Sequence, residues 1–209
     1  MSAFRNTLFG LGLVTVLASC GGNTEVKKVE VPEVEVKSNL KYDYVSTNIQ
    51  FGGFKTTDKV EVKGKFDKFT VSNTKEGSTG KEVFEGATIA ILTSSVNTNN
   101  PDRDKKISTL FFGAMAGTDT IHASVKSIDE SNGKITLGLN LNAIEKDLVL
   151  AYEQSGDTVR ASGTIDLLTF EAQPAVDELN KACFDLHKGA DGVSKTWSEA
   201  NVYIQSVLR

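Results

Sequence analysis

The chain has 209 residues, of which 39% are hydrophobic and 24% charged, with 18 glycines and three prolines, a composition typical of one folded domain. Its 23 basic and 27 acidic side chains give a formal net charge of −4. No basic run could neutralise a series of phosphates, which argues against nucleic-acid binding. Two cysteines and two histidines do not support a disulfide framework or a structural zinc site.

The N-terminus has the layout of a secretory signal. Arg5 precedes an apolar stretch at residues 8–17, which is followed by small residues and Cys20. About ten apolar residues are too few to cross ~30 Å of hydrocarbon at 1.5 Å per residue, so a membrane-spanning helix is disfavoured. The sequence Leu17-Ala18-Ser19-Cys20 resembles the bacterial lipobox, which implies lipid attachment at Cys20 after removal of residues 1–19. The alternative is a buried hydrophobic helix with an incidental cysteine.

Residues 20–38 are predicted to form a lipidated tether. They mix valine with glutamate and lysine, contain Pro32, and include no aromatic residue, so they can bury little surface. At ~3.3 Å per residue the tether could reach ~60 Å. An edge strand carried by the valines is the alternative, but Pro32 and the charge density argue against it. We therefore expect a body at 39–209 that is lipid-anchored in the bacterial cell envelope, on the periplasmic side or the cell surface.

The body is dominated by alternation of apolar and polar residues with period two, most clearly at 134–142. Along the segment that begins at Val60, the apolar positions change parity between Phe66 and Phe69. This change predicts a bulge or turn near Asp67 and Lys68. Eight strands are predicted in all, at residues 42–54, 60–71, 82–96, 119–128, 134–142, 147–154, 159–167 and 197–208.

Two segments have helical periodicity instead. Asn100 is a suitable N-cap, Pro101 occupies the first helical position, and apolar residues follow at helical spacing up to Phe111. The second segment, 174–188, begins with proline, carries an apolar stripe that includes Cys183, and is followed by glycine. Each segment is predicted to be a short amphipathic helix inserted between strands.

Eight mainly antiparallel strands are expected to close into a β-barrel, because closure removes exposed strand edges. A two-sheet sandwich is the alternative. A barrel of this size either fills with its own side chains or holds one ligand. The residues alone leave both outcomes open: large phenylalanines gather in the first three strands, whereas the other inward positions are mostly smaller.

In their order along the chain, several segments resemble the YceI-like family of polyisoprenoid-binding proteins. The resemblance spans about 40 to 209 and implies an all-β, eight-stranded antiparallel lipocalin-like barrel with two short inserted helices, which binds an apolar lipid and performs no catalysis. Two departures are the stretch 120–124, where the family has a Pro-x-Ile-x-Phe strand, and the helical insertion 174–188. The segments that carry the resemblance are 62–66, 97–104 with Leu110-Phe111-Phe112, 139–150 and 160–166.

Period-two parity and this resemblance together predict which side chains form the inner wall. Arg103 and Asp104 at the start of the first helix are candidates either to hold a ligand head group or, as we favour, to fix the helix structurally. The predicted wall residues are Val62, Phe66, Ile91, Ile135, Leu137, Leu139, Ile165 and Leu167.

No motif for catalysis or metal binding is present, so we predict no enzyme activity, no metal and no cofactor apart from a bound isoprenoid or other lipid. His122 has the polar parity of its strand, and His187 is placed near a helix C-terminus, where a protonated imidazole is favoured. Both are expected at the surface. Cys183 is expected to act as a small buried hydrophobe without a redox role.

Two functions remain. The first is a lipid-anchored binding protein that holds a long apolar or amphiphilic ligand, such as a polyisoprenoid, a quinone or a fatty amide, in its barrel. The alternative is a structural or interaction lipoprotein with a filled barrel and no small ligand. Lipid that copurifies with the protein would distinguish the first from the second.

Overall fold

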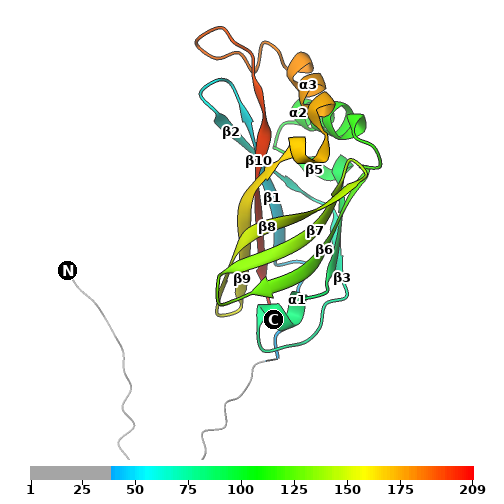
Figure 1. Cartoon of the computed structure of the whole chain (residues 1–209), viewed down its shortest axis with the longest axis vertical. Helices are drawn as coiled ribbons and strands as arrows, with labels where there is room; N and C mark the ends of the chain where they lie inside the picture. Colours follow the sequence, from blue (N-terminus) through cyan, green and yellow to red (C-terminus); the bar gives the residue numbers. More distant parts are fainter. Residues whose placement is uncertain (1–38) are drawn as a thin grey trace, which may run out of the picture. The chain divides into compact units, whose positions relative to one another are not determined.

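The structure, a computed structural model, describes residues 39–209; the predicted signal peptide, Cys20 and the tether lie outside the described residues. The described chain forms one antiparallel sheet of ten strands in the order β3-β4-β6-β7-β8-β9-β10-β1-β2-β5 (Figure 1). The strands are β1 Thr47–Lys55, β2 Val60–Phe66, β3 Phe69–Ser72, β4 Thr88–Leu92, β5 Val96–Asn97, β6 Thr120–Asp129, β7 Lys134–Leu141, β8 Ile144–Ser155, β9 Thr158–Asp166 and β10 Thr196–Val207.

The sheet curls until its two ends meet. Strand β2 leads directly into β3, and β4 leads through a short 3-10 turn, η1 (Thr93–Ser95), into β5. Because β3 pairs with β4 and β2 pairs with β5, the ten strands act as eight, two of which are kinked. The predicted lipocalin-like barrel is thus confirmed, in place of a sandwich.

The kink predicted near Asp67 and Lys68 is confirmed as well. The backbone N–H of Asp67 donates to the carbonyl of Ser95 at 3.0 Å, and the N–H of Leu92 donates to the carbonyl of Lys68 at 3.0 Å. These bonds join the two kinked strands where both leave regular strand geometry. The change of parity therefore lets Phe66 and Phe69 both remain buried.

The prediction of one strand over 82–96 is wrong in its first third. Residues Gly80–Phe84 form helix α1, whose N-cap Thr79 accepts a hydrogen bond from the backbone of Glu82 at 3.2 Å. The left-handed backbone of Gly86, with φ +90°, then separates the helix from β4. Helix formation places Val83 wholly inside the core, which the strand pattern did not reveal.

The two inserted helices are present, with different lengths. Helix α2 (Pro101–Lys106) has Asn100 as its N-cap, as predicted, and continues into a π-helical turn, η2 (Ile107–Phe111), and a 3-10 turn, η3 (Phe112–Ala114). The second helix, α3 (Gln173–Ala182), follows the 3-10 turn η4 (Leu167–Phe170) and ends six residues before the predicted limit of 188. After Ala182 the chain turns back toward β10 through a bridge between Lys188 and Ser194.

The barrel interior has two parts. At the end where α1 lies, a core cluster that includes Val83, Ile128, Leu150 and Leu208 fills the space. At the other end, a second cluster packs beneath the helical segments, and α2 and α3 lie over this end in Figure 1. No helix within 39–209 is both long enough and apolar enough to cross a bilayer.

Candidate ligand-binding cavity

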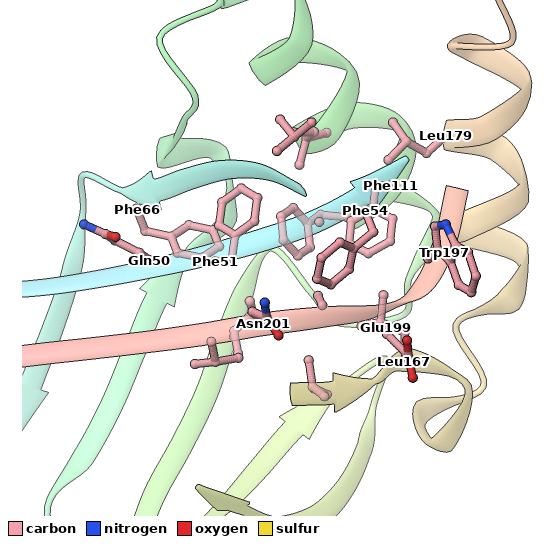
Figure 2. A pocket seen from close by; sticks show the side chains of 18 of the residues that line it. Gln50, Phe51, Phe54, Phe66, Phe111, Leu167, Leu179, Trp197, Glu199 and Asn201 are labelled. Carbon is pink, nitrogen blue, oxygen red and sulfur yellow. The ribbon is translucent and has the colours of Figure 1, made fainter. Parts of the chain in front are cut away.

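A cavity of about 510 Å³ lies between the barrel strands and the segments α2, η2 and α3. Aromatic side chains form one wall: the ring centroids of Phe51 and Phe66 are 5.4 Å apart, and those of Phe66 and Phe112 are 6.0 Å apart. Figure 2 shows Phe51, Phe54 and Phe66 gathered along β1 and β2, with Trp197 on the side of α3. The volume lies within the range of small-molecule pockets.

The structure places seven of the eight predicted wall residues around this one cavity. They come from strands distributed around the barrel and from η4, so parity along each strand brings them together. Ile135 also faces the interior, but it pairs with Ile128 and Leu150 in the filled core at the α1 end and does not line the cavity. The seven that do are Val62, Phe66, Ile91, Leu137, Leu139, Ile165 and Leu167.

Gly53 is an unpredicted part of the wall. It lines the cavity, and a Cβ atom added to it would meet nothing within 4 Å. Its neighbour Gly52 is different, since a Cβ there would lie 2.0 Å from Oε1 of Glu61. The absence of a side chain at Gly53 thus leaves room inside the barrel. The alternation of Ile49, Phe51 and Gly53 on β1 is the sequence signal that places this glycine inward.

Arg103 and Asp104 both bind Thr98, which is 6% exposed. Oδ1 of Asp104 accepts hydrogen bonds from the backbone N–H of Thr98 at 2.8 Å and from its hydroxyl at 2.5 Å. Nε and Nη2 of Arg103 donate to the hydroxyl and the carbonyl of Thr98 at 2.8 and 2.9 Å. The pair therefore fixes the start of α2 to the residue after β5. Arg103 also lines the cavity.

The prediction that His187 lies at the surface beside a helix C-terminus is wrong. Because α3 ends at Ala182, His187 falls in the following loop, where it is half-buried and lines the cavity. Burial, and then the nearby ammonium groups of Lys55 and Lys106, lower the pKa of His187 from 6.5 to about 4. The imidazole is neutral at pH 7, so it receives no stabilisation as a cation from a helix dipole. His122 is exposed on β6, as predicted.

Polar groups gather at one rim of the cavity. Nζ of Lys55 donates to the carbonyl of Leu186 at 3.2 Å, and Nζ of Lys106 donates to the carbonyl of Ala182 at 3.3 Å. Cys183 also lines the cavity and is 6% exposed, in agreement with its expected role as a small hydrophobe. Within residues 39–209, no group of three or more His, Cys, Asp or Glu side chains is placed to hold a metal ion.

The outer part of this rim is closed by an aromatic and ionic cluster. The ammonium of Lys59 forms an ion pair with Glu199 and lies 5.1 Å from the ring centroid of Phe54 and 4.8 Å from that of Trp197. The indole N–H of Trp197 donates to the carbonyl of Thr56 at 2.8 Å. These contacts join the β1–β2 hairpin to the start of β10.

Several known proteins are similar to this chain in sequence or in fold. A protein of Ectopseudomonas mendocina described as a UPF0312 protein is 31% identical over 122 residues, which are 57% of this chain and 56% of that protein, so the match spans about half of that relative's length. Two solved structures share the fold. BcnA of Burkholderia cenocepacia has a TM-score of 0.54 at 13% identity, covering 79% of this chain and 98% of that one. A polyisoprenoid binding domain from Saccharophagus degradans, implicated in plant cell wall breakdown, has a TM-score of 0.57 at 16% identity, covering 82% and 97%.

The family model that describes the YceI-like domain matches residues 40–198. This range begins just before β1 and ends within β10, so it includes nine of the ten strands completely, the start of β10, and both helices that cover the cavity. The chain therefore belongs to the YceI-like family.

Proposed function

We propose that this protein binds one long apolar or amphiphilic molecule inside its barrel and carries out no covalent step on it. The observation that supports this function is the cavity of about 510 Å³, whose walls are mostly aliphatic and aromatic and whose charged side chains lie at the end covered by α2 and α3. A cavity of this composition favours a ligand that is apolar along most of its length. Polyisoprenoids, quinones and fatty amides have this character, and the neighbour from Saccharophagus degradans is a polyisoprenoid binding domain.

The energetics of such binding are favourable. Burial of apolar surface yields ~25 cal/mol per Å², so a chain that buries ~400 Å² gains about 10 kcal/mol before the costs of ordering and association. This gain would retain a ligand through purification. An empty cavity of this size would forgo the same packing, which favours ligand binding over a structural lipoprotein with a filled barrel.

Native mass spectrometry of the purified protein tests this proposal. The Cys20→Ser variant is suitable because it separates a bound ligand from any covalent lipid. We expect a complex with one apolar molecule per chain, which organic extraction releases. A mass equal to that of the polypeptide alone, together with no binding of added long-chain lipid, would overturn the proposal in favour of an interaction lipoprotein.

We also propose that Cys20 is lipidated and anchors the protein in the bacterial cell envelope. The support is the lipobox-like sequence Leu17-Ala18-Ser19-Cys20 directly after an apolar segment. Intact mass and fractionation test this: the mature protein should begin at Cys20, carry acyl chains and sediment with membranes, whereas Cys20→Ser should do none of these. A mature chain that begins at Cys20 without added lipid mass would contradict the anchor.

A further inference from the structure

We propose that the ligand carries an anionic head group, a carboxylate or a phosphate, and that Lys55, Arg103 and Lys106 bind it at the rim of the cavity. This inference rests on the proposed function, because the apolar part of the same molecule occupies the barrel. It assigns a chemical class to the ligand: an acidic amphiphile rather than a neutral one.

The first support is the placement of three cations on one rim. Lys55 ends strand β1, whereas Arg103 and Lys106 belong to helix α2, and all three line the cavity. Across residues 39–209, none of the three lies within 4.0 Å of a carboxylate oxygen, although lysines elsewhere on this domain form such pairs. All three side chains are partly exposed, so their charges remain solvated in the free protein and are available to pair with an anion at the mouth of the cavity.

The second support is that these cations retain free donors. Each of the two ammonium groups can donate three hydrogen bonds, and only one is used, on the carbonyl of Leu186 or Ala182. Arg103 uses Nε and Nη2 on Thr98, which leaves Nη1 available. Charge-assisted hydrogen bonds of this kind are strong and suit carboxylate and phosphate oxygens.

The acidic groups on the same rim do not cancel this charge. Two carboxylates, those of Asp102 and Glu199, line the cavity. Glu199 forms an ion pair with Lys59, so its charge is already compensated. Asp102 is exposed and lies in the first turn of α2, where solvent screens it. Asp104 does not line the cavity, but it shares the hydroxyl of Thr98 with Arg103 and so offsets part of the charge of Arg103. The rim therefore keeps a net positive charge, carried mainly by Lys55 and Lys106.

The surroundings of His187 agree with a common location for two of the cations. After burial, the causes that lower its pKa are the charges of Lys55 and Lys106, which face it from β1 and α2. The hydroxyl of Thr196 donates to Oδ1 of Asn180 at 3.0 Å and must then accept from Nδ1 of His187, 2.6 Å away. An anion bound between the lysines would offset their charge and raise the pKa of His187.

A purely structural role is the competing explanation for the lysines. Both donate to carbonyls at or just beyond the C-terminal end of α3, a position where cations stabilise a helix. Such a role would weaken binding of every ligand equally when the lysines are changed. A head-group role would weaken binding of acids only, so the ratio of the two affinities separates the explanations.

The experiment uses the full-length chain with Cys20→Ser, after removal of bound lipid, and the neutral fluorophore N-phenyl-1-naphthylamine as the displaced probe. Hexadecanoic acid, hexadecyl phosphate and hexadecanol then compete for the cavity. We expect at least one of the two acids to bind about tenfold or more tightly than the alcohol. In the Lys55→Gln/Lys106→Gln variant this ratio should fall toward one, with the affinity for hexadecanol unchanged. The control is Lys68→Gln/Lys134→Gln, which removes the same number of charges from two exposed positions that do not line the cavity, and it should preserve the ratio.

NMR titration of His187 in the protein with Lys55, Arg103 and Lys106 unchanged adds a measurement that does not depend on the folding of the lysine variant. Hexadecanoic acid or hexadecyl phosphate should raise the pKa of His187, whereas hexadecanol should not. If the acids and the alcohol bind equally tightly, or if the lysine variant loses all three equally, the head-group inference is overturned and the apolar-ligand function stands. If none of them displaces the probe, both fail. If hexadecanoic acid binds more tightly, the head group of the ligand is a carboxylate; if hexadecyl phosphate does, it is a phosphate.

Discussion

Leu139 of β7 pairs directly with Ala123 of β6, and both side chains line the cavity. The next residue, Asn140, pairs with His122 on the outer face, where both are exposed. Neighbouring residues of β7 therefore face the cavity and the solvent in turn at the middle of the proposed binding surface.

This alternation makes Leu139→Asp and Asn140→Asp a matched pair. Leu139→Asp places an unpaired carboxylate against an apolar wall, so we expect loss of bound lipid and a fall in stability of about 3 kcal/mol or more. Asn140→Asp should leave both within measurement error. Lipid quantification after extraction, together with urea unfolding, measures the two effects. Retained lipid in a folded Leu139→Asp protein would show that the ligand does not use this wall.

Gly53→Leu should close the cavity without disturbing the barrel. The added side chain projects into open space, so the free energy of unfolding should stay within about 1 kcal/mol, while affinity for a long-chain ligand falls about tenfold or more. Probe displacement and thermal unfolding give the two values.

Gly52→Ala is the corresponding control on the outer face. Its Cβ would displace Glu61, whose carboxylate accepts hydrogen bonds from Asn201 and Tyr203 at 2.9 Å. We expect a loss of stability of about 1 kcal/mol with unchanged ligand affinity. A loss of affinity in Gly52→Ala as large as in Gly53→Leu would show that the effect is indirect.

Thr98→Val tests the connection between β5 and α2. Valine keeps the shape of threonine but removes the hydroxyl that joins Arg103 to Asp104, and it leaves their charged groups with fewer partners. We expect a loss of about 2–3 kcal/mol in the free energy of unfolding, measured by urea titration. Thr70→Val, at an exposed position of β3, should change stability by less than about 0.5 kcal/mol. Equal losses of stability in the two variants would show that the hydroxyl of Thr98 does not stabilise the connection between β5 and α2.

The lowered pKa of His187 predicts a pH dependence. The folded protein holds this pKa at about 4, whereas the unfolded chain should titrate near 6.5, so the unfolded state binds more protons between these values. Stability should therefore fall as pH decreases from 7 to 4, by about 1–2 kcal/mol for this partly exposed group. Unfolding curves for the protein and for His187→Asn should converge in this pH window. A constant difference between them would contradict the assignment.

Several features could be predicted from sequence because they depend on local patterns. Alternation along β7 predicts that Leu139 faces inward and Asn140 outward without reference to distant segments. The change of parity between Phe66 and Phe69 predicts the position of the kink. The N-cap at Asn100 follows from a side chain three residues from its partner. Each of these signals is contained within about ten residues.

Other features depend on contacts between distant segments. Ile135 and Leu137 share the inward parity of β7 and both belong to the filled core, but only position along the barrel decides that Leu137 also reaches the cavity and Ile135 does not. The environment of His187 depends on lysines that are 132 and 81 positions earlier in the sequence. Helix α1 is five residues long, too short for helical periodicity to be distinguished from alternation.

The kinked side of the barrel has a consequence for local opening. There β2 and β5 pair in register only at Lys65 with Asn97 and at Phe66 with Val96, next to the cavity. So short a ladder should open more readily than the long pairing of β7 with β8, and its amide protons should exchange with solvent sooner. Phe66 belongs both to this ladder and to the cavity wall. A ligand packed against that ring would therefore slow amide exchange along the kinked strands, so that occupancy of the cavity and closure of the sheet favour one another.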